Sequence, residues 1–357
     1  VGAVGDAWNQ SGLIDTSIDF IADVAVSAGG SADPCATDTP CLYIGTINTF
    51  FGAPGSAQDD EWESLTGKVG ECDSIWRKCA DGGWLRIWHK ELGGREVFEG
   101  HWTEWMVLGL APEEKLDAET LYMADLGTPY VWFSQDSADV CCPAGLGCWS
   151  KRNTGLSNIV DIAVLDASTV YALDADANVR KSTNNARHWS SSVDSEVDMG
   201  HHIVAWGDWV LVGGVKGIVG YSDDAGSSFS ELDDIGAGYV TVAFDSYFNQ
   251  NGYVYAAVAG FEGDGNKKGV YRTTIDDADF KSLNACDDLM YTGIVVSAAD
   301  GNPKTSASTG GVLYVSYIDP SEDEQGAPDY ACSVSGVARL LNPAVEPCCG
   351  EADWDYL

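Results

Sequence analysis

The sequence predicts an all-β protein built from repeated sheets of four short antiparallel strands. Three observations lead to this class. Short apolar runs recur along the 357 residues, none of them carries the 3.6-residue period of a surface helix, and glycine-rich turns separate them. The composition agrees, because 41 glycines and 13 tryptophans are more typical of strands and turns than of a helical bundle.

Each expected repeat contains three apolar strands in succession, and a fourth strand follows a turn. First strands are expected at residues 18–26, 105–110, 159–165, 203–206, 240–244 and 294–297. Second strands are expected at 41–46, 120–124, 170–173, 209–213, 253–258 and 312–318. Third strands are expected at 75–78, 131–134, 179–182, 219–222, 270–273 and 337–340. A helical turn is expected at 113–120, inside a loop.

The turn between the third and fourth strands is most complete at residues 221–229. Ser222, Asp224, Gly226 and Phe229 fit the pattern Ser-x-Asp-x-Gly-x-x-aromatic. In this spacing the hydroxyl and the carboxylate cap the backbone of a tight turn, and glycine supplies a residue with positive φ. The aromatic side chain then enters the next strand and packs inward.

Imperfect copies of this octet follow other third strands. One copy has Ser182, Asn184 in place of the aspartate, and Trp189, while another begins with Ser134 and Asp136. The copies start at intervals of roughly 40–50 residues, which is the length of a four-stranded propeller blade. The sequence therefore predicts a β-propeller of four-stranded antiparallel blades. We expect six blades, with seven as the alternative.

The octet and its copies resemble the repeats of the Asp-box, or bacterial neuraminidase repeat, β-propeller superfamily. This superfamily includes sialidases, xyloglucanases and sortilin-type receptors, and the resemblance covers most of the chain. It implies one propeller domain over residues 1–357 in which the Asp box is a structural feature of the rim. The blades are expected at about 18–92, 102–153, 159–192, 201–233, 239–283 and 292–357, and residues 1–17 contribute a closing strand or mark a cut from a longer chain.

Catalytic residues are not expected. The resemblance would imply an arginine triad and a Tyr/Glu pair for a sialidase, but the chain has only eight arginines and lacks the Arg-Ile-Pro segment of that family. A glycosidase of the xyloglucanase type would need two carboxylates on either side of a cleft, and the sequence does not single out a pair among 55 acidic residues. A secreted glycoside hydrolase of this type remains the alternative function.

The charge is strongly acidic, with 19 Lys and Arg against 55 Asp and Glu and a net charge of −36. Such a surface repels nucleic acid and anionic lipid, and no apolar run is long enough to insert into a membrane. It favours cations, and Asp174, Asp176 and Asn178 place oxygen atoms at alternate positions as calcium loops do. The competing interpretation is an ordinary polar turn. Calcium is the candidate ion, and no cofactor is required.

Two adjacent histidines, His201 and His202, open an apolar strand. They are interpreted as hydrogen-bonded structural residues and not as metal ligands.

Eleven cysteines lie in local groups, which predicts disulfides and an oxidising compartment. They are Cys35, Cys41, Cys72, Cys79, Cys141, Cys142, Cys148, Cys286, Cys332, Cys348 and Cys349. The odd number implies a free thiol, an intermolecular bond or a partner in a longer chain. The first residue is Val1, so we expect a processed product or a part of a longer protein.

These features together predict a non-catalytic propeller that is secreted or held at the cell surface. Its expected role is binding or self-assembly, as in a surface layer, a filament or an adhesion module. The expected partners are a protein, a glycan or further copies of the chain. Contacts are expected on the loops at 48–60, 140–148 and 321–331, because long loops carry recognition surfaces more often than strands do.

Overall fold

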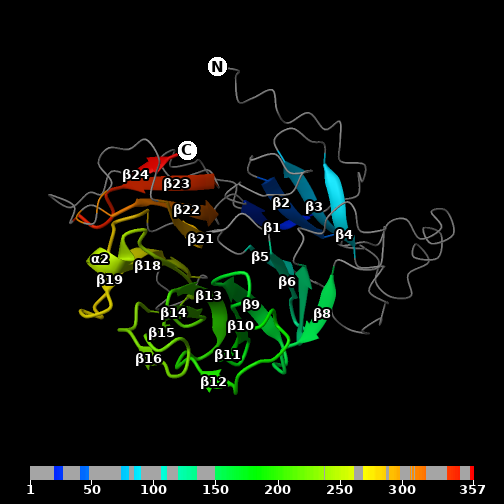
Figure 1. The fold of residues 1–357 in the computed structure, drawn as a ribbon. Coiled ribbons are helices and arrows are strands. Elements are labelled where there is room, and N and C mark those ends of the chain that lie inside the picture. The colour runs from blue at the N-terminus through cyan, green and yellow to red at the C-terminus, as the bar shows by residue number, and fades with distance from the viewer. Residues whose placement is uncertain are drawn as a thin grey trace, which may run out of the picture. The chain divides into compact units, whose positions relative to one another are not determined.

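Six antiparallel sheets of four strands each make up the fold, which confirms the predicted β-propeller class (Figure 1). The structure is a computed structural model. It describes residues 20–26, 41–47, 74–79, 84–89, 106–110, 120–134, 149–236, 238–260, 268–286, 289–297, 306, 308, 310–318, 336–345 and 354–357.

Blades 1 to 3 are formed by the first twelve strands. Blade 1 contains β1 (Phe20–Val26), β2 (Cys41–Ile47), β3 (Ser74–Cys79) and β4 (Leu85–His89). Blade 2 contains β5 (Met106–Leu110), β6 (Leu121–Asp125), β7 (Tyr130–Ser134) and β8 (Ser150–Asn153). Blade 3 contains β9 (Ile159–Val164), β10 (Val170–Asp174), β11 (Asn178–Ser182) and β12 (Val193–Asp194).

Blades 4 to 6 repeat the same order of strands. Blade 4 contains β13 (Gly200–Trp206), β14 (Trp209–Gly214), β15 (Val219–Ser222) and β16 (Ser230–Glu231). Blade 5 contains β17 (Tyr239–Phe244), β18 (Tyr253–Ala259), β19 (Gly269–Thr274) and β20 (Lys281–Ser282). Blade 6 contains β21 (Met290–Ser297), β22 (Val312–Ile318), β23 (Gly336–Leu341) and β24 (Trp354–Tyr356).

The chain divides into two compact units. Unit 1 consists of Val1–Ile159, Val164–Val170 and Ser182–His188. Unit 2 consists of Val160–Ala163, Tyr171–Lys181 and Trp189–Leu357.

Each sheet is a simple meander in which every strand pairs with the next strand along the chain. In blade 4, for example, β13 pairs with β14 so that Trp206 lies opposite Trp209 at the tip of the hairpin. The first strand of each sheet is therefore an edge strand, paired on one side only. We call this first strand the inner strand. Half of its backbone N–H groups face away from the sheet and need another acceptor.

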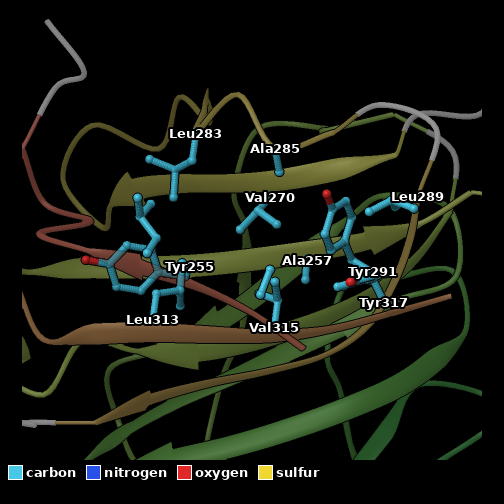
Figure 2. Packing of buried hydrophobic residues seen from close by; sticks show 12 residues of the cluster. Tyr255, Ala257, Val270, Leu283, Ala285, Leu289, Tyr291, Leu313, Val315 and Tyr317 are labelled. Atoms are coloured by element: carbon cyan, nitrogen blue, oxygen red, sulfur yellow. The ribbon is translucent and has the colours of Figure 1, made fainter. Parts of the chain in front are cut away.

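Apolar packing between blades builds the core of unit 2. Tyr255, Ala257 and Val270 of blade 5 form one buried cluster with side chains of blade 6 and of the connection between the two blades. Figure 2 shows these side chains interleaved with Leu283, Ala285, Leu289, Tyr291, Leu313, Val315 and Tyr317. Full burial of one such side chain contributes about 1.5–3 kcal/mol, so this junction is a major source of stability.

In unit 1, blades 1 and 2 pack in the same way. Tyr43 and Ile75 of blade 1 meet Met106, Leu108 and Leu121 of blade 2 in a buried cluster.

Gly45 lies at the same junction of blades 1 and 2. A Cβ atom added to Gly45 would lie 2.8 Å from the sulfur of Met106. The glycine in β2 thus allows the inner strand of the next blade to approach closely.

Among the described residues, one short helix departs from the all-strand expectation. Helix α2 (Phe248–Asn251) lies between β17 and β18 and ends at Gly252, whose φ of 66° closes the turn. Residues 113–119 of the helical turn expected at 113–120, the closing strand at 1–17 and the loops at 48–60, 140–148 and 321–331 lie outside the described residues. No helix among the described residues is long and apolar enough to cross a membrane.

Candidate functional site

Polar side chains recur at one aligned position of the inner strands. They are Asp23, Asp161, His202 and Thr241, whereas blade 2 has Val107 and blade 6 has Gly293 at this position. In blades 1, 4 and 6 the register of the inner hairpin shifts directly before this position, between Ile21 and Asp23, Gly200 and His202, and Tyr291 and Gly293. Such bulges re-aim side chains out of the regular alternation of a strand.

Asp23 caps two backbone N–H groups in unit 1. Its Oδ1 accepts a hydrogen bond from the N–H of Val24 at 2.7 Å, in its own strand. Its Oδ2 accepts from the N–H of Leu108 at 2.8 Å, in the inner strand of blade 2. One carboxylate therefore serves the free edges of two consecutive blades.

Asp161 repeats this arrangement in unit 2. Its Oδ1 accepts from the N–H of Ile162 at 2.8 Å, and its Oδ2 accepts from the N–H of Ile203 in blade 4 at 2.7 Å. Asp161 is buried, with 6% of its surface exposed. Because a buried carboxylate is costly unless it is hydrogen-bonded, these two bonds lower the cost of burying an aspartate here.

His202 takes the same role for blade 5. Its Nδ1 accepts a hydrogen bond from the N–H of Val242 at 3.3 Å. A ring nitrogen that accepts a hydrogen bond carries no proton, so the neutral ring has its proton on Nε2. The expectation that His202 is a hydrogen-bonded structural residue is confirmed.

Three side chains thus cap the aligned N–H group in five consecutive inner strands. We call Asp23, Asp161 and His202 the inner-strand caps. The capped N–H groups belong to Val24, Leu108, Ile162, Ile203 and Val242. Thr241, at the aligned position in blade 5, instead donates its hydroxyl to the carbonyl of Ala257 in its own blade.

Burial shifts the pKa values of the titratable side chains at and next to the aligned position. The pKa of Asp23 is raised because burial disfavours its charged form, although the hydrogen bonds from Leu108 and Val24 act in the opposite direction. The pKa of His202 is lowered to about 4 by burial and by the neighbouring His201. Burial also lowers the pKa of His201, whose ring packs edge-on against Tyr239. The imidazoles are therefore neutral at pH 7.

The predicted turn octet forms a closed hydrogen-bond ring at the opposite edge of blade 4. Oδ1 of Asp224 accepts from the Ser222 hydroxyl at 2.8 Å and from the N–H groups of Ser227 and Ser228 at 2.9 Å. The hydroxyl of Ser228 donates to Oδ2 at 2.7 Å, and the N–H of Gly226 donates to the Ser222 hydroxyl. These bonds lower the pKa of the exposed Asp224 to about 2.

The copy in blade 3 has the same arrangement, with the side-chain amide of Asn184 in place of the carboxylate. Oδ1 of Asn184 accepts from the Ser182 hydroxyl at 3.1 Å and from the N–H of His188 at 2.8 Å. Gly226 has a φ of 79°, and its counterpart Ala186 has a φ of 57°. The alanine therefore holds a left-handed conformation that glycine adopts more easily.

The remaining octet residues fall in three places. Phe229 and Trp189 are half-buried at the ends of their turns, and Ser134 is buried at the end of β7. Asp136 lies outside the described residues. The octet residues and the inner-strand caps occupy different strands of each blade, so the structure does not bring them into one site.

Buried tyrosines in the second strands are a feature that the sequence reasoning missed. The hydroxyl of Tyr122 donates to the carbonyl of Ala167 in the first hairpin of blade 3, at 3.0 Å. The hydroxyl of Tyr171 donates at 3.4 Å to the carbonyl of Ala225 in the blade 4 octet. Each of these hydrogen bonds links a tyrosine of one blade to a turn of the next blade. A tyrosine after an apolar residue in strand after strand was a visible signal, at Tyr43, Tyr122, Tyr171, Tyr255 and Tyr314.

In blade 5 the tyrosine meets a buried carboxylate. Tyr255 donates its hydroxyl to Oδ2 of Asp245 at 2.8 Å, and Asp245 is fully buried. The N–H groups of Tyr247 and Gly311 and the side-chain amide of Asn251 also donate to this carboxylate. These four groups all donate to the carboxylate, so Asp245 organises the loop around α2. This use of a carboxylate is structural.

The calcium candidates lie in the turn between β10 and β11. Oδ1 of Asp174 accepts from the backbone N–H of Asn178 at 2.8 Å and from its side-chain amide at 3.1 Å. The amide nitrogen of Asn178, and not its oxygen, therefore faces Asp174. Asp176 is exposed. Among the described residues, no group of three or more His, Cys, Asp or Glu side chains could hold a metal ion.

Cys41 and Cys286 are each disulfide-bonded. Eight of the predicted disulfide cysteines lie outside the described residues, namely Cys35, Cys72, Cys141, Cys142, Cys148, Cys332, Cys348 and Cys349. The backbone of Cys41 lies opposite that of Cys79 across β2 and β3. The pairing of the whole set stays a prediction.

A pair of half-buried tryptophans marks one end of blades 4 and 5. Trp206 and Trp209 flank the tip of the β13–β14 hairpin, where Gly207 has a φ of 60°. The indole N–H of Trp206 donates to the side-chain oxygen of Asn249 in α2 at 3.2 Å. The ring of Trp209 packs edge-on against Phe248, with 5.4 Å between ring centroids. Both rings are therefore held in place by blade 5.

Two turns are hydrogen-bonded to the segments that carry or contact these tryptophans. The N–H of Ala225, in the blade 4 octet, donates to the carbonyl of Asp208 at 2.8 Å, and the N–H of Ile275 donates to the carbonyl of Gly252 at 3.3 Å. The segments 206–209, 222–229, 245–252 and 274–280 contain no Lys or Arg. Their exposed carboxylates belong to Asp208, Asp223, Asp224, Asp276, Asp277 and Asp279. We call these residues, with Trp206 and Trp209, the acidic tryptophan end.

No family model matches the chain, and no curated protein matches it. Among solved structures the chain is similar to YCF48 from Cyanidioschyzon merolae, with 12% identity, a TM-score of 0.38, and coverage of 59% of this chain and 64% of that one. It is also similar to YCF48 bound to D1 peptide, with 12% identity, a TM-score of 0.40, and coverage of 60% and 63%. The chain thus spans less than two thirds of these structures. The β-propeller assignment rests on its own six sheets.

Proposed function

We propose that this protein is a non-catalytic binding module and that the acidic tryptophan end contacts a protein partner. The observation that carries the proposal is the pair of half-buried indoles, which blade 5 holds in fixed orientations through Asn249 and Phe248. Tryptophan dominates many protein interfaces because it offers a large contact area with little conformational freedom to lose.

The charge around the tip defines the chemistry of the partner. Six exposed carboxylates accompany the two indoles, and no Lys or Arg lies in the same segments. A segment rich in arginine or lysine fits such a surface, because its cations pair with the carboxylates and stack on the indole rings. The proposed partner is therefore a basic segment of another protein.

The polar residues elsewhere support a non-catalytic role. Asp161, His202 and Asp245 have the chemistry of catalytic groups, but each is engaged by backbone N–H groups. A carboxylate that already accepts two or more hydrogen bonds from the backbone is a poor general base. Their environments are those of residues that hold blades and loops together.

Binding is tested by intrinsic tryptophan fluorescence. The full chain is titrated with an arginine- and lysine-rich peptide, with a glutamate-rich peptide of equal length, and with a panel of oligosaccharides. We expect saturable binding of the basic peptide alone. Trp206→Ala should weaken this binding by at least about tenfold, as expected for an interface tryptophan, while Trp189→Ala in blade 3 should leave it unchanged.

Two outcomes would contradict the proposal. One is equal weakening by Trp206→Ala and Trp189→Ala, and the other is no binding of the basic peptide. Turnover of any polysaccharide, abolished by substitution of one carboxylate, would support the alternative of a secreted glycoside hydrolase.

The finer features of the function are also part of the proposal. We place the protein outside the cell or on its surface, because its cysteines suit an oxidising compartment. Assignment to the Asp-box superfamily is supported by the octet geometry of blade 4. Self-assembly is tested by light scattering of the full chain with calcium and with a chelator. A single monomeric mass in both conditions would remove self-assembly from the proposal.

A further inference from the structure

The cap of blade 5 differs chemically from the other inner-strand caps. The N–H of Ile203 is capped by a carboxylate oxygen, whereas the N–H of Val242 is capped by Nδ1 of His202. A carboxylate keeps a second oxygen as an acceptor even after it gains a proton. An imidazole nitrogen that gains a proton becomes a donor and accepts nothing.

Among the described residues, the titratable side chains around His202 lie on β9, β13 and β17. Asp161 on β9 faces it, with 3.9 Å between Oδ2 and Nε2. His201 is its neighbour on β13 and packs against the ring of Tyr239 on β17. Strand β14, which pairs with β13, carries no titratable side chain over Trp209–Gly214. The side chain of His202 is 29% exposed, so a proton from solvent can reach it.

We propose that His202 is an acid-sensitive latch between blades 4 and 5. When a proton from solvent binds Nδ1, the ring becomes an imidazolium with an N–H group on each nitrogen. The Nδ1–H group then faces the Val242 N–H, so the hydrogen bond across the junction is lost and two donors oppose each other. Loss of the proton to solvent restores the bond.

The electrostatics of the site agree with this geometry. Burial and the neighbouring His201 lower the pKa of His202 from 6.5 to about 4. Asp161 acts in the opposite direction, because a carboxylate near Nε2 favours the imidazolium, but burial outweighs it. The folded state thus holds the neutral ring while the unfolded chain takes up a proton below pH 6.5. The contribution of His202 to stability is complete above that pH and is lost as the pH falls through about 4.

The junction that the latch holds is between β13 and β17, which pack directly against each other. Within unit 2, β13 continues from His202 to Trp206, and β17 continues from Val242 to Phe244 at the aromatic cluster. Opening of the latch therefore loosens the inner edge of this junction first.

The test is amide hydrogen exchange of the full ¹⁵N-labelled chain between pH 7 and pH 4, with rates corrected for the intrinsic pH dependence. We expect the protection of the Val242 amide to fall across this range, by at most roughly 300-fold, which corresponds to the lowering of the His202 pKa from 6.5 to about 4. In His202→Gln the side-chain oxygen accepts a hydrogen bond at every pH, so protection should stay constant. His201→Gln is the matched control and should keep the fall in protection.

A parallel fall in protection in the native chain and in His202→Gln would overturn the proposal. If His202→Gln does not fold, the imidazole nitrogen shifts of the native chain decide. At pH 7 they must show the proton of His202 on Nε2, and its titration must coincide with the loss of Val242 protection. A proton on Nδ1, or titration without any change at Val242, would overturn the latch.

Discussion

Asp161 and His202 occupy the same position in consecutive blades, and they differ in how many N–H groups they cap. Asp161 caps the N–H of its own strand and that of the next blade, at Ile162 and Ile203. His202 has one acceptor nitrogen and caps only Val242. The difference shows that one carboxylate satisfies two inner strands, whereas one imidazole satisfies one.

Blade 2 shows the consequence of capping two inner strands with one aspartate. Asp23 caps both Val24 and Leu108, so blade 2 needs no polar cap for its own strand and has Val107 at the aligned position. Asp161 likewise serves blades 3 and 4, which leaves His202 free to serve blade 5. A cap in every second blade is therefore enough where the cap is an aspartate.

The largest effect is expected for Asp161→Ala. The substitution leaves two buried N–H groups without an acceptor, and each such group costs about 1–3 kcal/mol. We expect the free energy of unfolding in urea to fall by about 2–4 kcal/mol. Asp176→Ala, an exposed aspartate in the same blade, is the control and should change it by less than about 0.5 kcal/mol. Equal effects of the two substitutions would show that Asp161 caps nothing.

A smaller effect is expected for His202→Ala at pH 7. Only the Val242 N–H loses its acceptor, so the free energy of unfolding should fall by about 1–2 kcal/mol, which is less than for Asp161→Ala. His202→Gln should recover most of this loss because its oxygen takes the place of Nδ1. The comparison fails if His202→Ala destabilises the protein as much as Asp161→Ala does.

Asp23 should respond to pH with the opposite sign from His202. Burial raises the pKa of Asp23 above 3.8, so the folded state holds a proton that the unfolded chain has already lost. The contribution of Asp23 to stability therefore falls as the pH rises from 3.8 through the raised pKa of the folded state. The contribution of His202 instead rises between about pH 4 and 6.5.

The variant that isolates this effect is Asp23→Asn. It removes the titration and keeps one acceptor oxygen. The difference in free energy of unfolding between the native chain and Asp23→Asn, measured from pH 3.5 to pH 6, should become less favourable to the native chain as the pH rises. A difference that does not vary with pH would contradict the buried environment of Asp23.

The smallest effect is expected at the turn octet of blade 4. The bonds from Ser222, Ser227 and Ser228 lower the pKa of Asp224 to about 2, so its stabilising contribution is present above pH 3.8 and is lost as the pH falls through about 2. The octet should thus keep its hydrogen bonds at pH 4, where the His202 latch opens. Backbone amide shifts of Ser227 and Ser228 that change between pH 6 and pH 4 would contradict this order.

The sequence was sufficient to predict the fold because its signal is local. Apolar strands, glycine-containing turns and the Ser222–Phe229 octet are each written within a few residues, and their repetition defines the blades. The short helix α2 was not predicted, because its four residues carry no helical period.

The inner-strand caps were harder to predict, because their partners lie in another blade. The similarity between residues 18–26 and 159–164 aligns Asp23 with Asp161, so their equivalence was visible. Their role was not, because an aspartate in an apolar strand looks the same whether it binds a metal, a substrate or an unpaired N–H group. Only the register of neighbouring edge strands decides between these roles. The orientation of the Trp206 ring likewise depends on Asn249, which lies more than 40 residues later in the chain.

The central claim is that the inner-strand caps, Asp23, Asp161 and His202, accept hydrogen bonds from the N–H groups at the unpaired edges of the inner strands. Amide hydrogen exchange of Asp161→Ala at pH 7 tests it most directly. The claim predicts that the amides of Ile162 and Ile203 lose protection while that of Val242, which His202 caps, keeps it. Unchanged protection at Ile203, or equal loss at Ile203 and Val242, would contradict it.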